Sequence, residues 1–186
     1  TISQSEREPV LVLTMAYRPP LAWQPLTAFL GGRAIPGVER VSLGTWARAV
    51  RIDGRTGVIR VREPDRGSVL SGHDVLVLEV SAPLAPVLMP LSARVKHVFD
   101  LVAEPNAIEK HLVRTGFGAI PRGARGLRVP GAWDGFELAI RAIVGQQVSV
   151  AGPTTLMGRL TEHFGERLEV EEDGFTHLSP TAERLA

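Results

Sequence analysis

The stretch from Asp134 to Ser149 constrains the fold of this chain more than any other part of the sequence. Apolar residues recur in it at positions i, i+3, i+4, i+7 and i+8: Phe136, Ala139, Ile140, Ile143 and Val144. This spacing is typical of an amphipathic helix that buries one face. Asp134 can cap the start of the helix, and Glu137, three residues later, completes the pattern of a capping box. We expect the helix to end at Gly145, because glycine readily adopts the left-handed conformation that closes a helix.

Two uncharged amides follow the predicted end of this helix. Gln146 and Gln147 lie between apolar neighbours, and Ser149 can cap a second helix that continues to Gly165. A tight turn between two helices does not need two consecutive amides. The pattern therefore predicts that a buried helix delivers two hydrogen-bonding side chains to one defined place.

An alternating pattern of apolar and polar residues predicts an antiparallel sheet in the first half of the chain. Residues 10–15 form an apolar run that we expect to be a buried strand, and residues 74–80 form another strand. Residues 45–52 and 58–62 alternate on either side of Asp53-Gly54, which is a hairpin signal. Arginines alternate with apolar residues in both strands, which predicts a solvated face; a sheet face that reads DNA is the alternative.

Prolines and glycines delimit the predicted helices. We expect a short helix from Pro25 to Ala34, a long one over residues 84–102 and a third over residues 105–115. Three arginines then follow in the loop 121–128, where they either contact phosphate or are solvated. Residues 166–186 are acidic at first and end in what resembles the beginning of another helix.

These elements predict an α+β fold, in which an antiparallel sheet with flanking helices is followed by the first helices of an all-α domain. We expect residues 1–9 to be a tail or linker and residues 10–115 to be the α+β domain. Residues 116–186 are then an incomplete helical domain that carries the two amides.

The composition excludes several kinds of chemistry. The 186 residues have a net charge of +1 and include no cysteine, which excludes disulfides, thiolate metal sites and a cysteine nucleophile. The five histidines have no metal-ligand spacing, so we expect neither a metal nor a cofactor. No long apolar run is present, which predicts no membrane span and makes the cytoplasm the expected compartment.

Several short motifs together resemble one known family. In chain order they are Tyr17–Pro20, Trp23, Phe29–Ala34, Gly126–Gly131, Val129–Glu137 and Ala142–Val150. This ordered set resembles the DNA-3-methyladenine glycosylase II (AlkA-type) family, which belongs to the helix–hairpin–helix superfamily of base-excision glycosylases. The resemblance runs from about Leu13 to the last residue and corresponds to the amino-terminal portion of the family.

The resemblance implies that the chain binds double-stranded DNA containing alkylated bases and helps to rotate such a base out of the duplex. In the family, the loop that matches Gln146, Gln147 and Ser149 enters the gap left by the flipped base, and the residue at the position of Gln147 is the wedge. Phe29 matches an aromatic residue of the base pocket, where a cationic ring is attracted to a π face. The alternative for Phe29 is a core position on its helix.

The catalytic part of the family pattern does not occur in this sequence. In the resembled family, the hairpin that grips DNA and the catalytic aspartate lie downstream of the position of Ala186. Asp134 is better explained as a helix cap and Asp173 as a solvated surface charge. We therefore assign no catalytic residue and expect this chain alone to be inactive, although the parent protein is expected to be a DNA repair glycosylase.

Two further expectations concern the surroundings of the chain. The alternative function is a DNA-binding or regulatory module of an alkylation-response fusion protein, and some family members follow an upstream regulatory module. An incomplete helical domain also leaves part of the face of Phe136, Ile140 and Ile143 uncovered, which predicts dimerisation through this apolar face.

Overall fold

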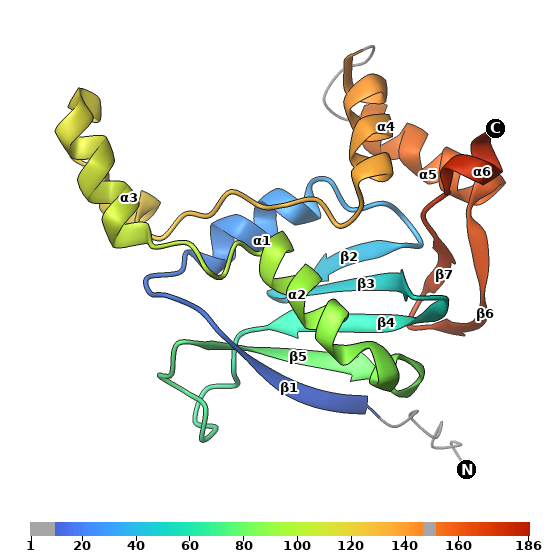
Figure 1. Cartoon of the computed structure of the whole chain (residues 1–186), viewed down its shortest axis with the longest axis horizontal. Coiled ribbons are helices and arrows are strands. Elements are labelled where there is room, and N and C mark those ends of the chain that lie inside the picture. Colours follow the sequence, from blue (N-terminus) through green and yellow to red (C-terminus); the bar gives the residue numbers. More distant parts are fainter. Residues whose placement is uncertain (1–9, 147–151) are drawn as a thin grey trace.

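The computed structural model describes residues 10–146 and 152–186 and has an α+β architecture (Figure 1). Of the residues predicted to form the DNA-wedge loop, Gln146 is described, whereas Gln147 and Ser149 lie outside the described residues. The predicted α+β fold, with an antiparallel sheet and flanking helices, is confirmed. The predicted division of the chain near residue 115 stays a prediction.

A five-stranded antiparallel sheet forms the centre of the molecule, with the strand order β1-β5-β4-β3-β2. The strands are β1 Val10–Ala16, β2 Glu39–Ser42, β3 Thr45–Ile52, β4 Arg55–Arg62 and β5 Val75–Ser81. The predicted hairpin joins β3 to β4 through Asp53 and Gly54, which both have positive φ values (48° and 77°). Such values suit a two-residue turn, because they match the twist of the strands on either side.

The prediction that residues 10–15 form a buried strand is half wrong. They do form a strand, but β1 is the edge of the sheet and pairs only with β5. Met15 is buried, whereas Val12 is 64% exposed. An edge strand has a neighbour on one side only, so its outer residues stay accessible even when they are apolar.

Helices cover one face of the sheet. The helix α1 (Trp23–Gly31) and the pair η1 (Ala82–Val87) and α2 (Leu88–Val98) contribute the apolar residues that pack on this face. The rings of Trp23 and Trp46 each lie 5.2 Å from the ring of Phe99, measured between centroids. Trp23 and Trp46 are therefore core residues.

A second hairpin covers part of the opposite face and was not predicted. Strands β6 (Glu166–Glu172) and β7 (Phe175–Leu178) form a separate two-stranded sheet. Phe175 and Leu178 pack against Ala47, Ala49 and Val58 of the large sheet. The alanines leave room for the larger side chains of the hairpin, so this contact depends on a size match that no local pattern reveals.

The remaining helices are α3 (Pro105–Leu112), η2 (Val113–Phe117), η3 (Arg122–Ala124), α4 (Gly135–Gln146), α5 (Gly152–Phe164) and the terminal α6 (Ala182–Leu185). In Figure 1, α3 projects away from the sheet, and a long loop leads from it to α4. The helix α4 matches the predicted helix, except that it continues through Gly145 to Gln146. None of the helices in the described part of the chain is long and apolar enough to cross a membrane.

One of the three loop arginines is buried, which contradicts both roles considered for it. Arg128 donates hydrogen bonds to the backbone carbonyls of Ala103 (2.8 Å), Pro20 (3.1 Å), Asp100 (3.3 Å) and Arg18. Its guanidinium thus holds the segments on either side together and is not available to DNA phosphates. An arginine can be buried in this way because backbone carbonyls accept hydrogen bonds from both of its terminal nitrogens.

Candidate functional site

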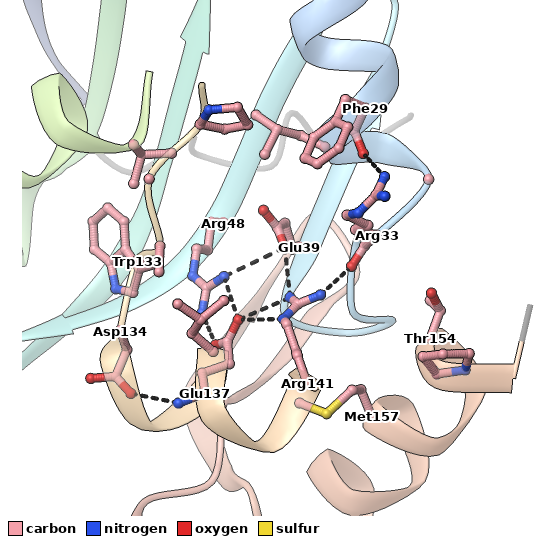
Figure 2. A pocket seen from close by; sticks show the side chains of 18 of the residues that line it. Phe29, Arg33, Glu39, Arg48, Trp133, Asp134, Glu137, Arg141, Thr154 and Met157 are labelled. Atoms are coloured by element: carbon pink, nitrogen blue, oxygen red, sulfur yellow. Dashed lines mark hydrogen bonds and ion pairs between the residues drawn. The ribbon is translucent and has the colours of Figure 1, made fainter. Parts of the chain in front are cut away.

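A cavity of about 560 Å³ lies between α1, the sheet and α4 (Figure 2). Phe29 and Arg33 line it from α1 and the segment that follows α1. Trp133 lines it from the loop before α4, and Met157 lines it from α5. Glu39 and Arg48 lie on its sheet side, with Glu137 and Arg141 opposite them on α4. The cavity therefore collects residues from the sheet, the loop and three helices.

Four charged side chains, Glu39, Arg48, Glu137 and Arg141, form a network on the floor of this cavity, which we call the four-charge network. The Arg48 guanidinium lies between both carboxylates and contacts Glu39 at 3.4 Å and Glu137 through both of its terminal nitrogens. Arg141 donates from Nε to Glu137 at 3.0 Å and from Nη2 to Glu39 at 3.3 Å. The two positive and two negative charges balance, which is the condition under which buried charges are tolerated.

Burial makes the four-charge network strong. Arg48 is 3% exposed and Glu137 is 5% exposed. Burial by itself raises the pKa of Glu137, but the nearby Arg48 guanidinium, followed by Arg141 and the Ser179 hydroxyl, outweighs burial and lowers that pKa to about 2. Burial by itself lowers the pKa of Arg48, but the nearby carboxylates of Glu137 and Glu39 outweigh burial and raise that pKa above its ordinary value. Arg48 and Glu137 therefore stay charged near neutral pH.

The position of Arg48 contradicts the prediction of a solvated arginine face. Arg48 is buried on β3, two residues from Trp46, whose indole Nε1 donates to Glu39 at 2.5 Å. The neighbouring arginines of the sheet are also engaged, since Arg62 pairs with Glu79 and Arg60 pairs with Asp173. Carboxylates that are distant in the sequence supply these partners, so an alternating pattern alone could not predict them.

The same contacts fix the start of α4. Asp134 accepts a hydrogen bond from the backbone N–H of Glu137 at 2.9 Å, which confirms its predicted role as a helix cap. The other half of the predicted capping box is not formed, because the Glu137 carboxylate instead binds Arg48, Arg141 and the hydroxyl of Ser179. The sheet and the segment after β7 thus both hold the first turn of α4.

An aromatic ring with a cation above it forms the opposite wall of the cavity. Phe29 is 44% exposed, which rules out the alternative of a core position, and its ring lines the cavity. The Arg33 guanidinium carbon lies 3.7 Å from the centroid of the Phe29 ring. Arg141 connects this wall to the network, because its Nη1 donates to the backbone carbonyl of Arg33 at 2.5 Å.

The predicted site residues are only partly brought together. Phe29 lines the cavity, and Gln146 is the exposed last residue of α4, one of the helices that bound the cavity. Sequence reasoning missed Glu39, Arg48 and Arg141; the only available signal was an arginine between alanines in a strand pattern. Asp173 is exposed and pairs with Arg60, as expected of a surface charge. Among residues 10–146 and 152–186, no cluster of histidine, aspartate and glutamate could hold a metal ion.

Comparison with known proteins gives consistent matches along the chain. The chain is 37% identical to DNA-3-methyladenine glycosylase 2 of Escherichia coli over 175 residues, which is 93% of this chain and 57% of that protein. It is 32% identical to a probable bifunctional transcriptional activator/DNA repair enzyme AlkA of Mycobacterium tuberculosis, covering 94% of this chain and 34% of the relative. The chain thus spans about a third to just over half the length of these curated relatives.

Two solved structures share the fold. A 3-methyladenine DNA-glycosylase from Archaeoglobus fulgidus matches with a TM-score of 0.67 at 19% identity, covering 94% of this chain and 57% of that one. MBOgg1, in its complex with a low-affinity DNA ligand, matches with a TM-score of 0.59 at 16% identity. This match covers 97% of this chain and 55% of that chain. The family model of the AlkA N-terminal domain matches residues 12–134. These residues make up most of the chain, and the chain therefore belongs to the AlkA N-terminal domain family.

Proposed function

We propose that this chain is the part of a DNA repair glycosylase that recognises alkylated bases and rotates them out of duplex DNA for hydrolysis of the N-glycosidic bond. The observation that carries the proposal is the shared cavity: the half-exposed ring of Phe29 and the helix α4, which ends at Gln146, bound the same space. A base pocket and a wedge must act on the same nucleotide. The course of α4 along this cavity towards Gln146 supports a joint role for the pocket and the proposed wedge.

Each part has a distinct task in this proposal. Rotating a nucleotide out of the duplex costs a few kcal/mol of stacking and pairing. Gln147, with Gln146 and Ser149 beside it, fills the gap and offers a donor and an acceptor to the unpaired partner base. Phe29 provides a π face for an alkylated ring. The four-charge network holds α4 against the sheet and so fixes the position of this helix relative to Phe29.

The bond-breaking step is assigned to no residue of this chain. Asp134 is engaged as a helix cap and Asp173 as a surface ion pair, so neither is available to stabilise charge on a sugar. The Escherichia coli relative, named a glycosylase, is considerably longer than the matched region. This proposal therefore assigns the catalytic aspartate and the DNA-gripping hairpin to no residue of these 186.

A DNA-binding or regulatory module without glycosylase activity is the competing proposal. It is supported by the Mycobacterium tuberculosis relative, whose name combines a transcriptional activator with a DNA repair enzyme and of which this chain matches about a third. An upstream regulatory module fused to this chain is part of both proposals. The two differ in one outcome, because only the glycosylase releases free base from DNA that it binds.

The test is base release by the complete protein from a duplex that contains one alkylated base. We expect release above the spontaneous rate, and we expect Phe29→Leu to lower it about 3- to 30-fold, the range for loss of a cation–π contact. Phe164→Leu is the matched control, since Phe164 is similarly exposed (41%) but does not line the cavity. Tight binding without release would favour the regulatory module. A protein that neither binds the duplex nor releases the base would refute the proposal.

A further inference from the structure

The aromatic wall of the cavity already carries a cation. The Arg33 guanidinium carbon lies 3.7 Å from the Phe29 centroid, so it occupies one of the two faces on which a flipped base could stack. Both residues line the cavity. Any ligand that stacks on this face must displace the guanidinium or lie against it (Figure 2).

The guanidinium is held in place by the local backbone. Arg33 Nη1 donates to the carbonyl of Phe29 at 3.2 Å, so the side chain folds back over the end of α1. The backbone of Arg33 is fixed in turn, because its N–H donates to the carbonyl of Leu30 at 3.0 Å and its own carbonyl accepts from Arg141. The position of the cation over Phe29 thus follows from the way the chain leaves α1.

Arg33 lies outside the four-charge network, as does Asp134, the other charged residue that lines the cavity, which caps α4. The charges of Glu39, Arg48, Glu137 and Arg141 cancel within the four-charge network. In the described part of the chain, no carboxylate forms an ion pair with Arg33. The Phe29 ring therefore has a positive charge beside it that no ion pair within the described residues balances.

We propose that Arg33 is a specificity-determining residue that disfavours permanently cationic alkylated bases relative to neutral ones; this inference rests on the proposed function. A cationic ring, such as 7-methylguanine in DNA, competes with the guanidinium for one π face and is repelled by its charge. A neutral ring, such as ethenoadenine, allows the guanidinium to stay, and the guanidinium can donate hydrogen bonds to the ring nitrogens of that base. The pocket thereby discriminates by charge as well as by shape.

The test compares excision of 7-methylguanine and ethenoadenine by the complete protein and by its Arg33→Met variant. Methionine keeps an unbranched chain of similar reach but removes the charge. We expect the ratio of 7-methylguanine to ethenoadenine excision to rise about two- to fivefold, the range for an exposed cation–π contact. Arg33→Lys, which keeps the charge, should change the ratio less than Arg33→Met.

Arg122→Met is the matched control, because it removes one exposed positive charge from η3, which does not line the cavity. It should lower binding of both substrates equally and leave the ratio unchanged. If Arg33→Met excises both bases at an unchanged ratio, the role assigned to Arg33 is wrong while the proposed function stands. If the wild-type protein excises neither base, the proposed function fails and this inference fails with it.

Discussion

Breaking the four-charge network at Glu137 provides the most direct test of the fold. In Glu137→Gln, the amide keeps the shape of the side chain but removes the charge that faces Arg48, which is 3% exposed. The network then holds two positive charges, Arg48 and Arg141, against the single carboxylate of Glu39. Removing one member of a buried ion pair typically costs about 3–5 kcal/mol in the free energy of unfolding.

The pKa of Glu137 gives a second, independent magnitude. It falls from the ordinary value of 4.5 to about 2 in the folded protein. At about 1.4 kcal/mol per pKa unit, this difference corresponds to a stabilisation on the order of 3 kcal/mol. Because the folded-state pKa is lowered, the stabilisation is complete above the unfolded pKa of 4.5 and is lost as the pH falls towards about 2.

The assay is urea unfolding of the 186-residue chain at pH 7 and at several lower pH values down to about 2. We expect Glu137→Gln to lower the free energy of unfolding by about 3 kcal/mol at pH 7. We also expect it to weaken the loss of stability that the wild type should show between about pH 4.5 and pH 2. Glu166→Gln is the control, since the pair of Glu166 with Arg51 is partly exposed and exposed pairs contribute about 0–1 kcal/mol.

A double mutant separates a lost partner from lost packing. Combining Arg48→Met with Glu137→Met leaves Glu39 and Arg141 as a balanced pair, so the double mutant should be more stable than the sum of the two single changes predicts. Strict additivity, or a Glu137→Gln variant within about 1 kcal/mol of the wild type, would refute the claim that these charges stabilise one another.

Three further predictions concern the isolated chain. It should release no alkylated base from DNA above background, because no residue in it is assigned to bond cleavage; release that persists in highly purified material would contradict this. It should self-associate through the uncovered face of α4, where Ile143 is 63% exposed, and a strict monomer in ultracentrifugation with no binding of a hydrophobic dye would argue against that face. Gly126→Ala should lower the melting temperature, because Gly126 has a φ of 76° and an added Cβ would lie 2.8 Å from the backbone of Pro20; an unchanged melting temperature would count against this packing.

The sequence predicted the elements whose signals are local. The β3–β4 hairpin followed from alternation around Asp53-Gly54, and α4 followed from its apolar spacing and the cap at Asp134. The family resemblance placed Phe29 at a pocket, and the structure shows its ring lining a cavity. For the hairpin and for α4, the residues that carry the signal are neighbours in the chain.

The features that the sequence could not predict depend on distant partners. Arg48 is buried because Glu39 and Glu137 meet it from β2 and α4, and Glu137 lies 89 residues further along the chain. Arg128 is buried because four backbone carbonyls from two segments surround it. The β6–β7 hairpin was missed because its acidic residues resemble a solvated segment, while its packing depends on small residues of β3. Periodicity describes which face of an element is apolar but not which charge will face it.

The central claim is that the loop after α4 delivers a wedge to DNA, and the most direct measurement is excision by Gln147→Ala in the complete protein. Alanine leaves the vacated gap empty, which should cost about 1–3 kcal/mol, the range for a good base contact or stacking contact. The loss should be larger for a normally paired lesion than for a mispaired one, because less pairing must be broken in the mispaired duplex. Salt dependence should change little, since no phosphate contact is removed. A lower melting temperature with unchanged excision per folded molecule would show that Gln147 only supports the turn and would contradict the claim.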